Sequence, residues 1–213
     1  MKTDDLITML ATGVEPMEAN MLRRRYVTAL GWGAFGATLI MAIMLGVRSD
    51  LAEAVLLPMF WVKLGFAATL VAGALVAATR LSRPGTPLGR VGVGIAAPII
   101  AMWLLAGVVL MGATPEARDG LLFGQTWVSC PFNVAIISAP LFVALLWAMK
   151  GLAPTRLMLA GGAAGLLAGA SGAFVYALHC PEMTAPFIAI WYVLGMLIPT
   201  ILGAILGPRL LRW

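Results

Sequence analysis

The chain has few charged residues. Only 11% of its 213 residues are Asp, Glu, Lys or Arg, whereas an ordinary soluble domain carries about 25%. Apolar residues make up 62% of the chain, and its mean hydropathy is +0.99. This composition excludes an ordinary soluble domain. It predicts an integral membrane protein whose main surroundings are the lipid bilayer.

Groups for acid–base chemistry are also scarce. There is one histidine and there are nine acidic residues, most of them between the apolar runs. No glycine-rich phosphate loop follows a strand pattern, and no Ser/His/Asp set or zinc-protease helix occurs. We therefore predict a protein that is not an enzyme and has no resident cofactor. Nothing in residues 1–25 resembles a secretory signal peptide, because this stretch is polar and begins with an acidic pair.

Long polar stretches are missing after residue 25. Six apolar runs are each close to the roughly 20 residues that a spanning helix needs. They cover about 26–46, 55–79, 91–111, 131–149, 157–178 and 187–207. The sequence therefore predicts an all-α bundle of six transmembrane helices over 26–207. A cytoplasmic N-terminal segment, 1–25, precedes the bundle, and a cytoplasmic tail, 208–213, follows it.

The basic residues are distributed unequally between the two sides of this topology. Eleven lie in the terminal segments and in loops two and four, whereas only Arg48 and Arg118 lie in loops one, three and five. The eleven are Lys2, Arg23, Arg24, Arg25, Arg80, Arg83, Arg90, Lys150, Arg156, Arg209 and Arg212. By the positive-inside rule both termini are cytoplasmic. Because the basic residues are scattered in short gaps, the net charge of +5 does not indicate direct nucleic-acid binding.

The two cysteines share an unusual context. Cys130 ends loop three and Cys180 lies in loop five, so both are predicted on the outer, periplasmic face, where thiols can be oxidised. Each precedes a proline, and "SCPFN" and "HCPEM" predict helix starts with the cysteine at the cap and proline just inside. A thiol at that position has a lowered pKa. Glu182 is predicted in the same first turn as Cys180, where its charge opposes that lowering.

Several interpretations of this pair stay open. The thiols can form a constitutive disulfide that pins two outer loops, or they can be two unrelated small apolar residues. In the functional interpretation, which we favour, their redox or metal-bound state matters. A bond between them requires a Cα separation under about 7 Å.

Metal binding at the cysteines is a further interpretation. With His179 and Glu182, the thiols offer ligand types that suit a soft or borderline cation such as zinc or cadmium. The spacing matches no strong metal motif, so we expect at most transient binding of a soft metal ion. A lone histidine at a membrane interface is more often a hydrogen-bonded interfacial residue.

Two features lie inside the spans. Lys63 is about eight residues into the second run, a depth of about 12 Å. We expect it to snorkel outward, and the alternative is a buried partner contact. Gly161, Gly165, Gly169 and Ala173 recur at helical spacing in the fifth run. They predict close packing inside one bundle rather than a homodimer seam.

The N-terminal segment carries a short amphipathic pattern. Thr3 can cap a helix with two acidic residues in its first turn. The pattern fits either a frayed tail on the membrane or a docking peptide that folds on a partner. The candidate docking residues are Asp4, Asp5, Leu6, Ile7 and Leu10.

Longer stretches carry a family resemblance that covers the whole chain. "FGQTWVSCPFN", "KGLAPTR", "VYALHCPE", "PFIAIWYVLGM" and "LGPRLLRW" closely resemble the NrsF-like proteins, negative regulators of extracytoplasmic-function sigma factors. "MKTDDLITML" and "PMFWVKL" fit the same family. The Cys-Pro motifs are the most specific part of the match.

The resemblance implies a six-span anti-sigma factor of the bacterial inner membrane. It implies that the cytoplasmic side holds a sigma factor inactive, and that Cys130 and Cys180 sense heavy metals or oxidants. The N-terminal segment is then the expected sigma contact, and the output is stress-dependent transcription. Two other classes remain as alternatives: a membrane thiol-redox protein, which usually carries a Cys-x-x-Cys pair, and a heavy-metal transporter, which usually has thiols or carboxylates within its spans.

Overall fold

Six long helices make up the body of the chain in this computed structural model, which describes residues 3, 5 and 20–212. Five of them are α2 (Met21–Met44), α4 (Pro58–Leu81), α5 (Val91–Gly112), α7 (Ser129–Lys150) and α8 (Leu157–Tyr176). The sixth is made of α9 (Ala185–Phe187), the π-helix η1 (Ile188–Tyr192) and α10 (Val193–Leu210). No strand occurs in the described residues. All six are long and apolar enough to cross a membrane, which confirms the predicted all-α architecture.

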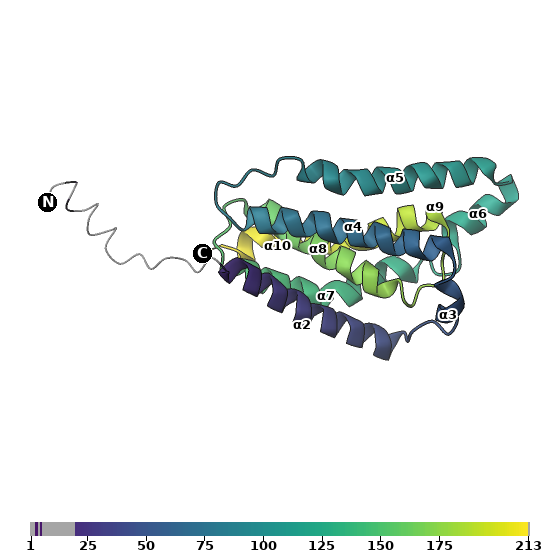
Figure 1. Cartoon of the computed structure of the whole chain (residues 1–213), viewed down its shortest axis with the longest axis horizontal. Coiled ribbons are helices and arrows are strands. Elements are labelled where there is room, and N and C mark those ends of the chain that lie inside the picture. The colour runs from purple at the N-terminus through teal and green to yellow at the C-terminus, as the bar shows by residue number, and fades with distance from the viewer. Residues whose placement is uncertain (1–2, 4, 6–19, 213) are drawn as a thin grey trace.

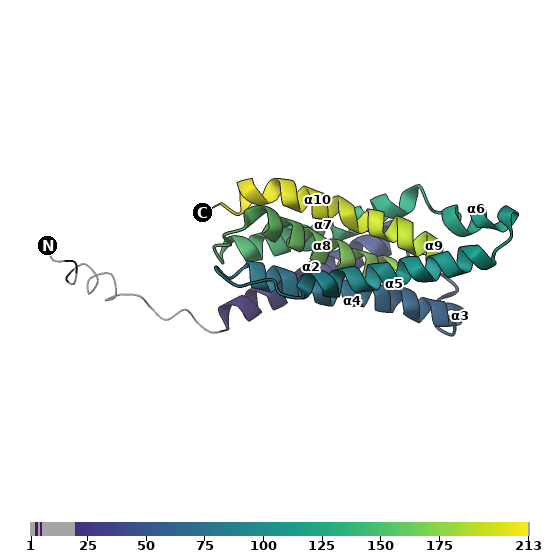
Figure 2. The ribbon, with the colours of Figure 1, turned by 90° about the horizontal axis from the view of Figure 1, so that it is seen from above.

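The helices run side by side, so their ends gather into two groups (Figures 1 and 2). The start of α2 and the end of α10 lie at one end of the bundle, which we call the inner end. Two short helices, α3 (Leu51–Ala54) and α6 (Pro115–Phe123), lie with α9 at the opposite, outer end. Prolines at the first positions of α4 and α6 fit there because their missing N–H has no partner in the first turn.

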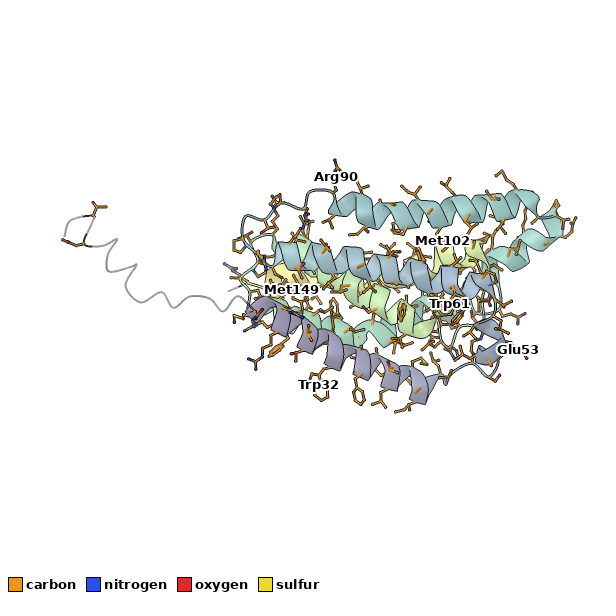
Figure 3. All side chains as sticks on the ribbon, in the orientation of Figure 1. Trp32, Glu53, Trp61, Arg90, Met102 and Met149 are labelled. Carbon is orange, nitrogen blue, oxygen red and sulfur yellow. The ribbon has the colours of Figure 1, made fainter. Side chains whose placement is uncertain are left out.

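The helices differ in how much neighbouring helices cover them. In an apolar stretch of 18 residues of α8, 61% of the residues are buried inside the protein. The corresponding share in α5, which lies along one side of the bundle, is 11% (Figure 1). Large side chains such as Trp32, 71% exposed, point away from the helices (Figure 3). Such faces suit the bilayer, where apolar exposure has no cost.

The centre of the bundle is a close contact between α8 and α10. A Cβ atom added to Gly161 would collide with the carbonyl oxygen of Gly203, and one on Gly165 would collide with that of Pro199. Only glycine lets the two backbones approach this closely. The small residues of α8 therefore serve packing inside one bundle, as predicted.

A buried polar contact joins two helices at the inner end. The hydroxyl of Tyr26, in the second turn of α2, lies 2.8 Å from Oγ of Ser82, the residue that follows α4. Both side chains are buried. The contact fixes the inner end of α4 to the start of the helix that follows the N-terminal segment.

Candidate functional site

Cys130 lies in the first turn of α7, two residues after the N-cap Val128 and therefore not at the cap position that the sequence predicts. The helix begins at Ser129, and Cys130 and Pro131 are its second and third residues. The Cys130 N–H donates to the carbonyl of Thr126 at 2.8 Å, so it already belongs to a helical turn. The side chain is fully buried.

Cys180 does not cap a helix, and that prediction is wrong. Its N–H donates to the carbonyl of Tyr176 at 3.0 Å, so it closes the final turn after α8. The next helix begins only at Ala185, with Pro186 inside its first turn. Because the residue before a proline avoids helical geometry, Pro181 ends the turn at Cys180, and Pro186 takes the helix-start position.

The fold brings the two thiols together at the outer end. Both are free, both have 0% exposure, and both belong to the same buried cluster. Hydrogen bonding from the Cys130 thiol lowers the pKa of Cys180 to about 5, against the opposing effect of burial. The positive charge of Lys63 and the hydroxyl of Tyr192 act in the same direction. The direction agrees with the sequence expectation, but its source is this cluster and not a helix start.

Lys63 lies inside the cluster and does not snorkel. Its side chain is 0% exposed. Its Nζ donates to the carbonyl of Cys180 at 2.8 Å and to that of Glu182 at 3.0 Å, and it lies 5.2 Å from the centre of the Tyr192 ring. Within residues 20–212 no carboxylate hydrogen-bonds to Nζ. The buried partner contact, the alternative in the sequence interpretation, is therefore what the structure contains.

Tyr192 is a member of the cluster that sequence reasoning missed. It ends the π-helix η1, a type of helical irregularity that often marks functional sites. Its side chain is fully buried, and its hydroxyl has no hydrogen-bond partner of standard geometry in the described part of the chain. The nearby Cys180 sulfur is the group on which it acts electrostatically. The sequence did contain a signal for a buried polar site here, because Tyr192 is a polar side chain within an otherwise apolar run.

Glu182 does not lie in a helix turn beside Cys180, contrary to its predicted place, because the next helix begins only at Ala185. Its Oε1 accepts hydrogen bonds from the Gln125 N–H at 2.7 Å and from Oγ1 of Thr126 at 3.4 Å. Gly124 next to it has a φ of +53°, and a Cβ there would lie 2.5 Å from Oε2 of Glu182. The carboxylate therefore fastens loop five to the start of α7.

His179 also binds elsewhere. Its Nδ1 lies 2.9 Å from the carbonyl oxygen of Gly46, so Nδ1 carries the hydrogen that is donated. Arg48 makes two more contacts with loop five: its backbone N–H donates to the carbonyl of Leu178 at 3.2 Å, and its Nη1 donates to the carbonyl of Cys180 at 3.3 Å. Residues 45–50, which we call the strap, therefore hold the segment that carries Cys180.

The strap is itself stabilised by an ion pair between Arg48 and Asp50, at 2.6 Å. This pairing raises the pKa of Arg48 and lowers that of Asp50. Across the described residues, no group of three or more His, Cys, Asp or Glu side chains is placed to hold a metal ion. The residues do not form a four-ligand zinc site. The two thiols alone offer soft ligands.

The N-terminal docking candidates are mostly beyond the described part. Asp4, Leu6, Ile7 and Leu10 lie outside it, and Asp5 is helical. Their role as docking residues stays a prediction.

Taken together, the helices and the buried cluster define a six-helix membrane protein with a paired thiol site at one end. The chain belongs to the family described as negative regulator of sigma F, whose model matches residues 10–213. It is 56% identical over its full length to a "Probable anti-sigma-F factor NrsF" of Azospira oryzae. It is 40% identical to an "Anti-sigma-F factor NrsF" of Caulobacter vibrioides, and both alignments cover all of each chain. No solved structure matches it significantly.

Proposed function

We propose that this protein is a multi-pass anti-sigma factor of the bacterial inner membrane. It holds an extracytoplasmic-function sigma factor inactive and releases it when Cys130 and Cys180 react with an oxidant or bind a heavy-metal ion. Family membership and the names of two full-length relatives support the anti-sigma role. The observation that carries the sensing role is the meeting of two thiols, fifty residues apart in sequence, in one buried cluster.

The proposed orientation places the N-terminus in the cytoplasm and both cysteines on the periplasmic side. The excess of basic residues at the inner end supports it. The inner and outer ends are separated by helices of 22 to 24 residues, about 33 Å or more at 1.5 Å per residue. A signal at the thiols is therefore received on the opposite side of the membrane from a sigma factor.

Oxidation of the pair requires a two-electron oxidant, such as hydrogen peroxide. The Cys180 thiolate attacks one peroxide oxygen, which forms a sulfenic acid and releases hydroxide. The Cys130 thiol then attacks that sulfur, the S–S bond forms, and the hydroxyl leaves as water with the Cys130 proton. The two sulfurs lose two electrons, and the peroxide gains them. The lowered pKa of Cys180 makes it the first thiol to react.

A soft metal ion is the second proposed input. It replaces the thiol proton and binds both sulfurs, which suit soft cations. His179 and Glu182 are not ligands of this metal ion. The His179 ring is hydrogen-bonded to the Gly46 carbonyl, and the Glu182 carboxylate accepts a hydrogen bond from the Gln125 N–H, just before α7. Binding is transient, and the protein has no resident metal cofactor.

Burial of the thiols sets the order of events. Both have 0% exposure, so an oxidant or metal ion reaches them only after loop five and the strap move apart. The signal therefore acts on an opened state and stabilises it. A tenfold change in sigma affinity requires about 1.4 kcal/mol of preference between the two states.

The proposed sigma contact is the N-terminal segment 1–25, whose last five residues form the start of α2. Its acidic edge and its apolar residues fit a docking peptide that folds on its partner. The docking candidates are Asp4, Asp5, Leu6, Ile7 and Leu10. Regulation acts through the sigma factor, without direct contact between this chain and nucleic acid.

Co-purification and a transcription reporter test the proposal. The tagged full-length protein is expressed with a sigma factor encoded beside its gene, and sigma-dependent transcription is measured before and after cadmium or hydrogen peroxide. We expect the two proteins to co-purify. We also expect serine at both Cys130 and Cys180 to keep binding intact while abolishing induction. Intact induction without the cysteines would refute thiol sensing.

The same preparations separate the two alternatives. A thiol-redox enzyme or a heavy-metal transporter is active in purified vesicles that contain no sigma factor. If no sigma factor binds in the pull-down, and the vesicles oxidise thiols or move metal ions, the anti-sigma proposal is wrong.

A further inference from the structure

Lys63 connects the thiol site to a different helix from those that carry the cysteines. It belongs to the second turn of α4, whereas its hydrogen-bond acceptors are the carbonyls of Cys180 and Glu182 in loop five. In the described chain no other α4 side chain hydrogen-bonds to that loop. Lys63 is thus the polar link between α4 and the reactive segment.

Water cannot replace the carbonyls that Lys63 binds unless the buried thiol site opens. Lys63 is 0% exposed, and an ammonium group that loses its acceptors in a buried position is strongly destabilising. Arg48 shares the Cys180 carbonyl at 3.3 Å, and the Tyr192 ring covers Nζ at 5.2 Å. Any shift of the Cys180 backbone must therefore either move Lys63 as well or break the hydrogen bond between Lys63 and the Cys180 carbonyl.

Reaction of the thiols should produce such a shift. A disulfide requires the two sulfurs to approach to about 2.05 Å with restricted Cα geometry, and a metal ion between them also fixes their separation. Cys130 is held in the first turn of α7, so Cys180, in the connection between helices, is the partner that moves. Its carbonyl oxygen moves with it.

The other end of α4 lies next to the start of α2. Ser82, directly after α4, contacts the Tyr26 hydroxyl at 2.8 Å, and Tyr26 belongs to the second turn of α2. A displacement of α4 as a rigid helix therefore changes a buried contact at the base of the proposed docking segment. Lys63 lies near the outer end of α4, and Ser82 follows its inner end.

We infer that Lys63 is a positioning residue that couples Cys180 to α4, so that reaction of the thiols alters the Tyr26–Ser82 contact at the inner end. The inference rests on the proposed anti-sigma function and adds a path through α4 by which the thiols act on the inner end. Lys63 is not a reactant, although its positive charge helps to lower the pKa of Cys180. Its removal should separate disulfide formation from sigma release.

The test uses the full-length protein in liposomes with its sigma factor bound. Hydrogen peroxide is added, and the bound sigma factor and the free thiols are measured in the same sample. In Lys63→Met we expect sigma to stay bound before oxidation. The disulfide should form more slowly, because the charge of Lys63 favours the thiolate, so the peroxide treatment is continued until it is complete. The amount of sigma released per disulfide should fall at least about tenfold. A hydrogen bond to a charged group contributes about 1.5–3 kcal/mol, and about 1.4 kcal/mol corresponds to a tenfold change.

Two controls define specificity. Lys63→Arg keeps a positive donor and should restore most of the release, which a merely structural defect would not allow. Lys150→Met removes an exposed lysine at the inner end of α7 and should release sigma as the unaltered protein does. A second variant, Tyr26→Phe, tests the far end of α4 and should also reduce release per disulfide.

Two outcomes would overturn the inference. In one, Lys63→Met releases as much sigma per disulfide as the unaltered protein. In the other, it releases sigma before any oxidant is added, which means that Lys63 only holds the fold together. If Lys63→Met does not fold, an unchanged response in Tyr26→Phe overturns the route. A failure of release in the unaltered, fully oxidised protein instead overturns the proposed function.

Discussion

At the inner half of the bundle α8 and α10 touch backbone to backbone through Gly161 and Gly203, whereas at the outer end α4, α7 and loop five meet through Lys63 and two cysteines. The glycine contact has no room for a methyl group and contains nothing that titrates or reacts. The outer contact is made of hydrogen bonds to carbonyls beside a thiol whose pKa its neighbours lower.

The two contacts differ in how many arrangements each allows. A close backbone contact has one arrangement, because any shift creates a collision or a void. A polar cluster built on a loop has several arrangements that differ by a few hydrogen bonds. We therefore expect α8 and α10 to stay together while α4 and loop five move against them.

The largest effect is expected from breaking the glycine contact. Gly161→Ala places a Cβ against the Gly203 carbonyl and should destabilise the protein by about 1–3 kcal/mol through overpacking. The neighbouring Gly162→Ala is the matched control, because its Cβ would make only ordinary contacts, with the Cβ of Ala204 at 3.6 Å and the carbonyl oxygen of Thr200 at 3.8 Å. Thermal unfolding in one detergent compares the two. Equal melting temperatures would show that the contact is not tight.

The next effect concerns the charge of Cys180. Its folded pKa of about 5 lies below the ordinary thiol value, which is about 8.5. The unfolded chain therefore binds more protons between these values. The stability from this ionisation is complete above about pH 8.5 and is lost as the pH falls through about 5.

Alkylation against pH measures this charge directly. In Cys130→Ala, which removes the main cause of the shift, the midpoint should rise. The Cys180 rate at pH 6 should fall about tenfold or more, because only the thiolate reacts. Thiol-directed mass spectrometry follows the rate. A midpoint near the ordinary thiol value in the unaltered protein would contradict the cluster's electrostatics.

A smaller effect should follow when the strap is loosened. Arg48→Met removes the contact with the Cys180 carbonyl and the ion pair with Asp50. We expect alkylation of the buried thiols to accelerate by about fivefold, since opening costs about 1 kcal/mol less. Arg118→Met, in exposed loop three, is the control. If both variants label at the rate of the unaltered protein, the strap does not limit access.

The smallest effect is expected at Tyr192. Tyr192→Phe removes a buried hydroxyl that has no standard hydrogen-bond partner in the described residues, so the melting temperature should change little. The alkylation midpoint of Cys180 should still move upward, because the hydroxyl favours the thiolate. A large loss of stability with no change in midpoint would assign Tyr192 to packing alone.

Much of the fold could be predicted from the sequence because lipid imposes a simple rule. Apolar runs of about 20 residues are required of spanning helices, and the six predicted runs overlap the six observed helices. The glycine spacing in α8 predicted its close packing, since small residues are what membrane helices use for that purpose. The first turn of α7 at Cys130 followed from its proline.

The contacts of the site could not be predicted, because its partners are distant in sequence. Lys63 and the carbonyl that it binds are separated by 117 residues, so depth in the membrane alone could not distinguish snorkelling from burial. Two prolines, Pro181 and Pro186, compete for one helix start, and only the fold shows that Pro186 takes it. Glu182 and His179 looked like thiol neighbours because adjacency in sequence says nothing about side-chain direction.

The central claim is that thiols at the outer end control binding at the inner end. One measurement tests it most directly: the fraction of sigma factor bound to the full-length protein in membranes, followed together with the fraction of free Cys130 and Cys180 during titration with hydrogen peroxide. The account predicts that bound sigma falls in step with the free thiols and returns on reduction. Sigma that stays bound when both cysteines are fully oxidised would contradict it.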